Sequence, residues 1–184
     1  IIKEKIIKNF LKKSLTIISN LNIKNLIISD YSSIFKSYEI NKFFYDQFFK
    51  LKNYEQISIY VDSQFSSSFR NLNFYYSNYY FLNFREFNAV CSNLNIESNL
   101  SKETLLYIFK RLNIQNKLII KLGKEGSLSF DGKNIYQNKL KHSYHVKNVV
   151  GAGDYFLSAY VNFSSQNENN RLRKSNKFAS QKIK

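Results

Sequence analysis

Short runs that are almost wholly apolar recur along this chain, and each ends in a polar residue or a glycine. Runs without polar alternation are typical of strands that are covered on both faces, as in parallel sheets flanked by helices. Stretches with helical spacing of apolar residues separate most of them, and a polar loop separates the second run from the third. The pattern therefore predicts a layered α/β domain with a mostly parallel sheet. The expected strands are Leu26–Asp30, Ile57–Ser63, Tyr79–Asn83 and Lys117–Gly123.

The first expected helix covers residues 2–18 and is amphipathic. Its spacing places Ile2, Ile6, Phe10 and Ile17 near one face, with Ile7, Leu11 and Leu15 beside them, and lysines mostly on the other. We interpret it as a core helix with a solvated lysine face; the alternative is a helix that lies on a membrane surface. Further helices are expected over 38–52, Phe84–Cys91, Ser101–Leu112, Tyr155–Phe163 and Arg171–Lys184, with hairpins through Gln137. No boundary divides the chain, so a single domain over 1–184 is expected.

The chain is strongly basic, with 28 Lys and Arg against 13 Asp and Glu and a formal net charge of +15. Such a charge suggests nucleic acid, an anionic membrane or phosphorylated small molecules as partners. The excess of residues with AT-rich codons favours genomic drift as its cause. One Cys excludes a disulfide framework. No apolar run is long enough to span a bilayer, so we expect no membrane partner and a cytoplasmic location.

The strand ends carry the first indication of function. Ligands of parallel α/β sheets bind outside the carboxyl ends of the strands. Asp30, Asp62, Asn83 and Gly123 all stand at such ends. Asp30 and Asp62 are interpreted either as ligands of sugar hydroxyls or of a phosphate-bound cation, or as ordinary turn residues.

The most specific local motif is NVVGAGD, from Asn148 to Asp154, followed by an apolar helical run. A Gly-Ala-Gly turn that opens a helix leaves backbone N–H groups unpaired, and the helix dipole adds positive potential there. Phosphoryl transfer needs amides that hold the moving group and a carboxylate that accepts a proton. The alternative is a plain helix start, with Asp154 as a dipole-stabilising residue.

Two weaker motifs follow strands. Asn83 and Glu86 lie three residues apart at a helix start, and could hold a hydrated Mg²⁺ or simply form a capping box. The segment from Lys121 to Gly126 could border a nucleotide or be an ordinary hairpin turn. Neither a GxxxxGK[ST] loop nor a GxGxxG loop occurs.

Taken together, these motifs resemble the PfkB (ribokinase-like) carbohydrate kinase family. Residues 148–161 resemble its C-terminal signature, including Ser158 and Ala159. The resemblance implies a three-layer ribokinase-like fold, ATP and Mg²⁺ as cofactors, and a small-molecule sugar or sugar phosphate as substrate. It also implies that Asp154 is the catalytic base.

The resemblance assigns roles to the other motif residues. Gly151, Ala152 and Gly153 would form the anion hole, and Asn83 and Glu86 would position Mg²⁺. Lys121, Gly123, Gly126 and Asn176 would line the nucleotide site, and Asp30 would contact the substrate. Lys121 stands where the family commonly has Thr or Ser.

Within the family, the strand end at Asp30–Tyr31 and the segment VDSQFSSS at 61–68 look most like the kinase of ADP-heptose synthase, which acts on heptose 7-phosphate. Ser32 and Ser33 depart from it, because such kinases usually carry a Lys there. The chain resembles the C-terminal two-thirds of such a kinase, so we expect its sheet to lack the N-terminal strands and the lid. A homodimer is a further expectation.

Two other functions compete with the sugar kinase. A basic module for single-stranded nucleic acid would use the positive charge together with aromatic stretches such as FYYSNYYF at 74–81. An inactive relative of the kinases would explain the departures at Ser32 and Lys121. We favour the kinase, because nucleic-acid binding does not account for the GAGD motif in its context.

Overall fold

The computed structural model describes residues 4–30, 35, 37–63, 76–140 and 151–182 of the chain. Six strands form one sheet in this part of the protein, in the order of the sequence. They are β1 (Asn25–Asp30), β2 (Ser58–Ser63), β3 (Ser77–Asn83), β4 (Ile114–Lys121), β5 (Ser127–Phe130) and β6 (Ile135–Asn138). Strands β1 to β4 pair in parallel, whereas β5 and β6 add an antiparallel hairpin. The predicted mostly parallel sheet is confirmed.

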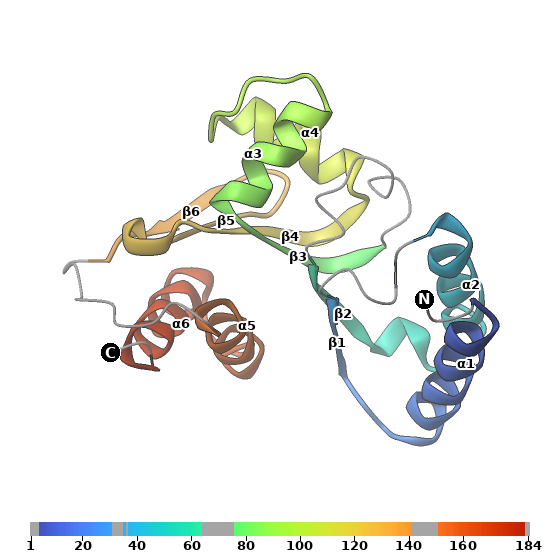
Figure 1. Cartoon of the computed structure of the whole chain (residues 1–184). Coiled ribbons are helices and arrows are strands. Elements are labelled where there is room, and N and C mark those ends of the chain that lie inside the picture. The colour runs from blue at the N-terminus through green and yellow to red at the C-terminus, as the bar shows by residue number, and fades with distance from the viewer. Residues whose placement is uncertain (1–3, 31–34, 36, 64–75, 141–150, 183–184) are drawn as a thin grey trace.

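Helices flank the sheet on both faces (Figure 1). They are α1 (Glu4–Asn20), α2 (Tyr38–Phe48), α3 (Phe84–Asn93), α4 (Lys102–Arg111), α5 (Ala152–Asn162) and α6 (Glu168–Lys182). Helices α3 and α4 lie on one face, α5 and α6 lie on the other, and α1 and α2 stand beside the β1 end. None of the helices in the described residues is long and apolar enough to cross a bilayer. The predicted α/β layers are thus observed.

Two hydrophobic clusters hold the layers together, because successive side chains of a strand point to opposite faces of the sheet. The larger cluster joins alternate strand residues, such as Val61 and Leu82, to α1 through α4. The smaller one lies under α5 and α6 and consists of Tyr60, Phe81, Ile119, Phe156, Leu157, Tyr160, Leu172 and Ala179. The second cluster fixes α5 against the centre of the sheet.

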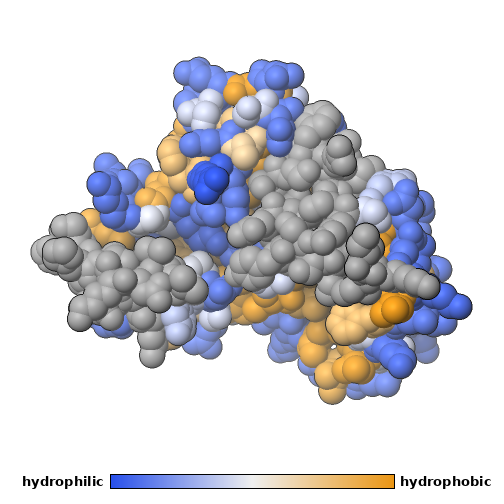
Figure 2. All heavy atoms as spheres, viewed as in Figure 1, coloured by the Kyte–Doolittle hydropathy of each residue, from blue (hydrophilic) through white to orange (hydrophobic). Residues whose placement is uncertain are grey.

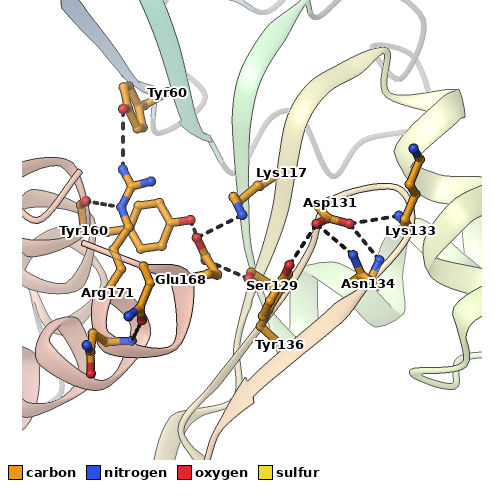
Figure 3. A network of polar contacts seen from close by, with 12 residues as sticks. Tyr60, Lys117, Ser129, Asp131, Lys133, Asn134, Tyr136, Tyr160, Glu168 and Arg171 are labelled. Carbon is orange, nitrogen blue, oxygen red and sulfur yellow. Dashed lines mark hydrogen bonds and ion pairs between the residues drawn. The ribbon is translucent and has the colours of Figure 1, made fainter. Parts of the chain in front are cut away.

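A buried carboxylate also anchors the α5–α6 pair to the sheet (Figure 3). The Glu168 carboxylate accepts hydrogen bonds from the hydroxyls of Ser129 at 2.7 Å and Tyr160 at 2.8 Å, and it pairs with Lys117 Nζ at 3.0 Å. Only 7% of the Glu168 side chain is exposed. These contacts join α6 to both α5 and the neighbouring strands β4 and β5.

Arg171 also holds the C-terminal end of α5. Its Nε donates to the carbonyl oxygen of Tyr160 at 2.7 Å, and its guanidinium lies 3.6 Å from the centre of the Tyr160 ring and 5.0 Å from that of Tyr79. A cation at the last turn of a helix satisfies orphan carbonyls and complements the dipole. The position of α5 is therefore set from its last turn as well as by its apolar face.

Only part of the apolar side predicted for the first helix is buried. Ile6, Phe10 and Ile17 are 58%, 54% and 58% exposed, whereas Leu11 and Leu15 are buried. The apolar residues of α1 cover too wide an arc to be buried on one side, and α1 packs against α2 through the side that carries the two leucines. The three exposed residues and Leu21, which is 52% exposed, form an uncovered stripe, here called the α1 stripe. Figure 2 shows hydrophobic residues on the surface at this end of the molecule.

Candidate active site

A small open pocket lies where the carboxyl ends of the parallel strands meet the start of α5. Its volume is about 150 Å³, and it is lined by Asp62, Asn83, Glu86, Lys121, Gly151, Gly153 and Asp154. A cavity needs only about 10–15 Å³ of such volume to hold one water, so the pocket has room for several waters or a phosphoryl group. Sites that enclose a whole drug-sized ligand are several-fold larger, typically ~300–1,000 Å³. The pocket is therefore of the right size for reacting groups.

Strand alternation explains why three of the polar side chains meet. Asp62, Asn83 and Lys121 each stand two positions after a residue of the smaller hydrophobic cluster, so all three point to the face that α5 covers. Asn83 and Lys121 are direct partners in the pairing of β3 with β4. Where the apolar packing against α5 ends, the next side chains on the same face of these strands are polar.

The first turn of α5 supplies backbone amides. Gly151 caps the helix with φ +80°, a left-handed conformation that glycine adopts without steric cost. No side chain of the cap bonds to this turn, and the first intrahelical bond runs from Tyr155 N to Gly151 O. The N–H groups of Ala152, Gly153 and Asp154 thus have no acceptor within the helix. They make the pocket wall suited to an anion.

The Asp154 side chain is exposed and lines the pocket. It stands in the first turn of α5, where the helix dipole favours a negative charge. A carboxylate at this place can take a proton from a group that enters the pocket and reacts beside the amides.

Asn83 and Glu86 both cap α3 and line the pocket. Asn83 Oδ1 accepts the N–H of Glu86 at 2.8 Å, and Glu86 Oε2 accepts the N–H of Asn83 at 2.7 Å. This is a complete capping box, as the alternative interpretation of the motif predicted. The box uses one oxygen of Glu86, so the carboxylate still contributes to the pocket wall. Both interpretations of the motif are therefore compatible with the structure.

Burial raises the pKa of Glu86, and the hydrogen bond from the Asn83 amide and the charge of Lys121 oppose that effect without cancelling it. A cation close to Glu86 would restore the ionised form. In the part of the chain that the structure describes, no three His, Cys, Asp or Glu residues are grouped closely enough to hold a metal ion by themselves. Mg²⁺ fits such a site only in its usual manner, through one or two carboxylates, waters and substrate phosphates.

An ion pair crosses the mouth of the pocket. Lys121 Nζ at the end of β4 lies 2.5 Å from Asp62 Oδ2 at the end of β2, two strands away. The exposed fractions of the two side chains are 15% and 12%, respectively. The sequence singled out both strand ends, but the contact between them depends on the strand order.

Other residues that the sequence assigned to the site lie away from this pocket. Gly123 has φ +60° and faces open space. Gly126 has φ +92°, and a Cβ on it would lie 2.0 Å from the carbonyl oxygen of Asn138, so the close approach of β5 and β6 explains this glycine. The buried Asn176 side chain donates to Ser127 Oγ at 2.9 Å and to Asn138 Oδ1 at 2.9 Å, which ties α6 to the same hairpin.

Some predictions fall on residues that the structure leaves undescribed. Asp30 ends β1 and is paired with Ser63, so its backbone reaches the carboxyl edge of the sheet, but its side chain lies outside the described part. Tyr31, Ser32, Ser33, the segment at 64–68 and the start of the glycine motif, Asn148–Val150, lie wholly outside the described residues.

Comparison with known proteins places this arrangement in context. The family model described as "pfkB family carbohydrate kinase" matches residues 2–181. Phosphofructokinase-2 from Escherichia coli, solved with substrates and products, superposes with a TM-score of 0.66 at 17% sequence identity, over 94% of this chain and 60% of that one. Ribokinase from Thermotoga maritima gives 0.64 at 15% identity, over 94% and 55%.

Ribokinase from Arabidopsis thaliana, solved with ribose and ATP, gives a TM-score of 0.66 at 17% identity, over 93% of this chain and 52% of that one. The chain thus spans 52% to 60% of the length of these three structures. At these identities the likeness shows the fold. No curated protein matches the sequence.

Proposed function

Because the chain belongs to the pfkB family of carbohydrate kinases, we propose that it transfers the γ-phosphoryl group of ATP to a hydroxyl group of a sugar or sugar phosphate. One observation carries the proposal: Asp154 and the open first turn of α5 share a pocket with Lys121 at the carboxyl edge of the sheet. A base, anion-binding amides and a cation are the groups that an in-line phosphoryl transfer needs.

Asp154 acts in this proposal as the general base. Its carboxylate accepts the proton of the attacking hydroxyl while the hydroxyl oxygen forms a bond to the γ-phosphorus. The bond from phosphorus to the β,γ-bridging oxygen breaks, and ADP leaves. An exposed carboxylate on the pocket wall supports this role, because the acceptor hydroxyl can reach it from solvent.

The amides at the start of α5 bind the moving phosphoryl group. The N–H groups at 152–154 have no acceptor within the helix. Gly151 and Gly153 have no side chains that could stand between these N–H groups and the pocket. Amides that are already oriented stabilise the charge on the equatorial phosphoryl oxygens without reorganising during the reaction. The Gly-Ala-Gly turn is the anion hole of the proposed enzyme.

The charges of the pocket favour Mg²⁺ as a cofactor. Three carboxylates share the pocket with one ammonium group, so the lining carries a formal surplus of negative charge. The phosphates of ATP would be repelled by this surplus unless a cation enters with them. Glu86, aided by Asn83, would hold hydrated Mg²⁺, which supplies positive charge to the phosphate oxygens.

The acceptor proposed from the sequence is a sugar phosphate, with heptose 7-phosphate as the first candidate, because of the segments at 30–31 and 61–68. A panel of sugars and sugar phosphates, each assayed for ATP-dependent ADP release, tests this choice. Turnover with heptose 7-phosphate alone supports the candidate. Turnover only with unphosphorylated sugars contradicts it and leaves the kinase proposal intact. Homodimer formation and a cytoplasmic location stay predictions of the same proposal.

The test of the mechanism is Asp154→Asn, which keeps the shape of the side chain but removes the base. We expect kcat to fall by about 10²–10⁴-fold, because that is the usual contribution of a general base. The melting temperature should stay close to that of the unmodified chain, because Asp154 is exposed. Asp46→Asn on the exposed side of α2 is the matched control and should leave kcat unchanged. Unchanged turnover in Asp154→Asn contradicts the mechanism.

A further inference from the structure

Lys121 occupies a position in the pocket that its strand alone does not explain. Its Nζ lies 2.5 Å from Asp62 Oδ2 and only 3.1 Å from the place that a Cβ on Gly153 would take. The ammonium group therefore lies close both to the carboxylate of Asp62 on β2 and to the first turn of α5 at Gly153. Its side chain is only 15% exposed.

The surroundings of this ammonium group point to an anion. The start of a helix carries a partial positive charge, so a cation placed over it is repelled by the dipole. Asp62 offsets that repulsion, and the two positive features converge on one small volume. A phosphoryl group that enters there meets both the Lys121 ammonium and the first turn of α5, because both line the pocket.

The absence of a side chain on Gly153 is part of the same arrangement. A Cβ at that residue would come within 3.1 Å of Lys121 Nζ, which is tighter than an ordinary contact. Glycine thus leaves room for the ammonium group to lie close to the helix backbone and to shift between Asp62 and a bound anion. The Lys121 side chain has five bonds from Cα to Nζ, so it is flexible enough for that small movement.

We propose that Lys121 is a catalytic residue of the phosphoryl transfer, which rests on the function proposed above. Its ammonium group is held by Asp62 before the nucleotide binds and contacts the γ-phosphoryl oxygens once ATP is in place. Lys121 keeps its proton throughout. It neutralises charge while the acceptor oxygen bonds to phosphorus, the bridging oxygen leaves with ADP, and Asp154 takes the hydroxyl proton.

Lys121→Met tests the contact, because methionine has a similar length and no charge. Binding of ATP and AMP to the full chain is measured by calorimetry, with and without Mg²⁺. We expect the affinity for ATP to fall by about 10–100-fold, the usual range for a lost hydrogen bond to a charged group. Affinity for AMP should be unchanged, because AMP has no γ-phosphate.

Two further variants separate charge from structure. Lys121→Arg keeps the cation and should retain the ATP affinity of the unmodified chain far better than Lys121→Met. Lys110→Met is the matched control: it removes the same charge from an exposed position in the last turn of α4, outside the pocket, and should change neither affinity. If Lys121→Met folds poorly, two other variants provide the comparison: Lys121→Arg, and the double variant Lys121→Met with Asp62→Asn. In each variant the ratio of ATP affinity to AMP affinity is measured.

The outcomes distinguish this proposal from the kinase proposal. If the unmodified chain binds ATP and transfers phosphate while Lys121→Met keeps its ATP affinity and turnover, only the role of Lys121 is overturned. Equal losses of AMP and ATP affinity in Lys121→Met also overturn it, because they indicate a disturbed fold. If the unmodified chain neither binds ATP nor releases ADP with any acceptor, both proposals fail.

Discussion

At the scale of single residues, Glu86 has two effects on stability that oppose each other. It completes the capping box of α3, and it stands in a pocket where burial raises its pKa. A carboxyl group whose folded-state pKa is raised binds its proton more tightly in the folded chain than in the unfolded chain. The stability linked to this group is present at low pH and is lost as the pH rises through the folded-state pKa.

Glu86→Gln should therefore stabilise the chain at neutral pH. Glutamine still accepts the N–H of Asn83 and keeps the capping box, but it has no charge to bury. Thermal melts from pH 4 to pH 8 should show a higher melting temperature for the variant at pH 8, with the difference vanishing below about 4.3, the ordinary pKa of Glu. A lower melting temperature at pH 8 would contradict this assignment. If Glu86 also holds Mg²⁺, the stabler variant should need more Mg²⁺ for turnover.

The residues of the pocket could be predicted one by one but not as a group. The positions of Asp154 in a helix start and of Asn83 at a strand end follow from local patterns in the sequence. The ion pair of Lys121 with Asp62 joins strands that are separated by β3, so it depends on a strand order that local patterns do not contain.

At the scale of elements, strands were easier to predict than the helix of mixed polarity at the C-terminus. The β2 and β3 runs are apolar on both faces, and their bounds match the expected ones closely. Helix α6 begins at Glu168, three residues before the expected start, because the polar run at 164–170 looks like a linker. Buried charged residues such as Glu168 and Arg171 are rare, so sequence patterns favour solvent for them.

Glu168→Ala should weaken the attachment of α6 to the sheet. The substitution leaves the Lys117 ammonium and the hydroxyls of Ser129 and Tyr160 without their shared acceptor. We expect the free energy of unfolding to fall by about 3 kcal/mol, the lower end for a broken buried ion pair, since Lys117 keeps some access to water. Denaturant titration measures the loss. Asn169→Ala, at the exposed neighbouring position, is the control, and an equal loss in both variants would refute the anchoring role.

At the scale of the whole molecule, the charge of +15 has to be weighed against the fold. The nucleic-acid alternative needs exposed aromatic rings for stacking. Tyr80 and Phe81 are buried, and the Tyr79 ring stacks on Tyr60 with centroids 4.4 Å apart. In the described part of the 74–81 stretch, these three rings therefore serve the core.

ATP and an oligonucleotide should affect thermal unfolding differently. A ligand at 100 times its Kd stabilises the folded chain by about 2.7 kcal/mol, so saturating Mg-ATP should raise the melting temperature measurably. A single-stranded oligonucleotide should bind through charge alone, and its effect should disappear between about 50 and 200 mM salt. Oligonucleotide protection that persists at 200 mM salt, without protection by Mg-ATP, would favour the binding module over the kinase.

The α1 stripe affects how the chain behaves in solution. Four large hydrocarbon side chains, more than half exposed, lie on α1 and directly after its end: Ile6, Phe10, Ile17 and Leu21. Exposed apolar side chains of this kind tend to associate with other apolar surface. Self-association would then make light scattering, sedimentation and turnover per molecule vary with dilution. The result of each assay would therefore depend on the concentration of the chain.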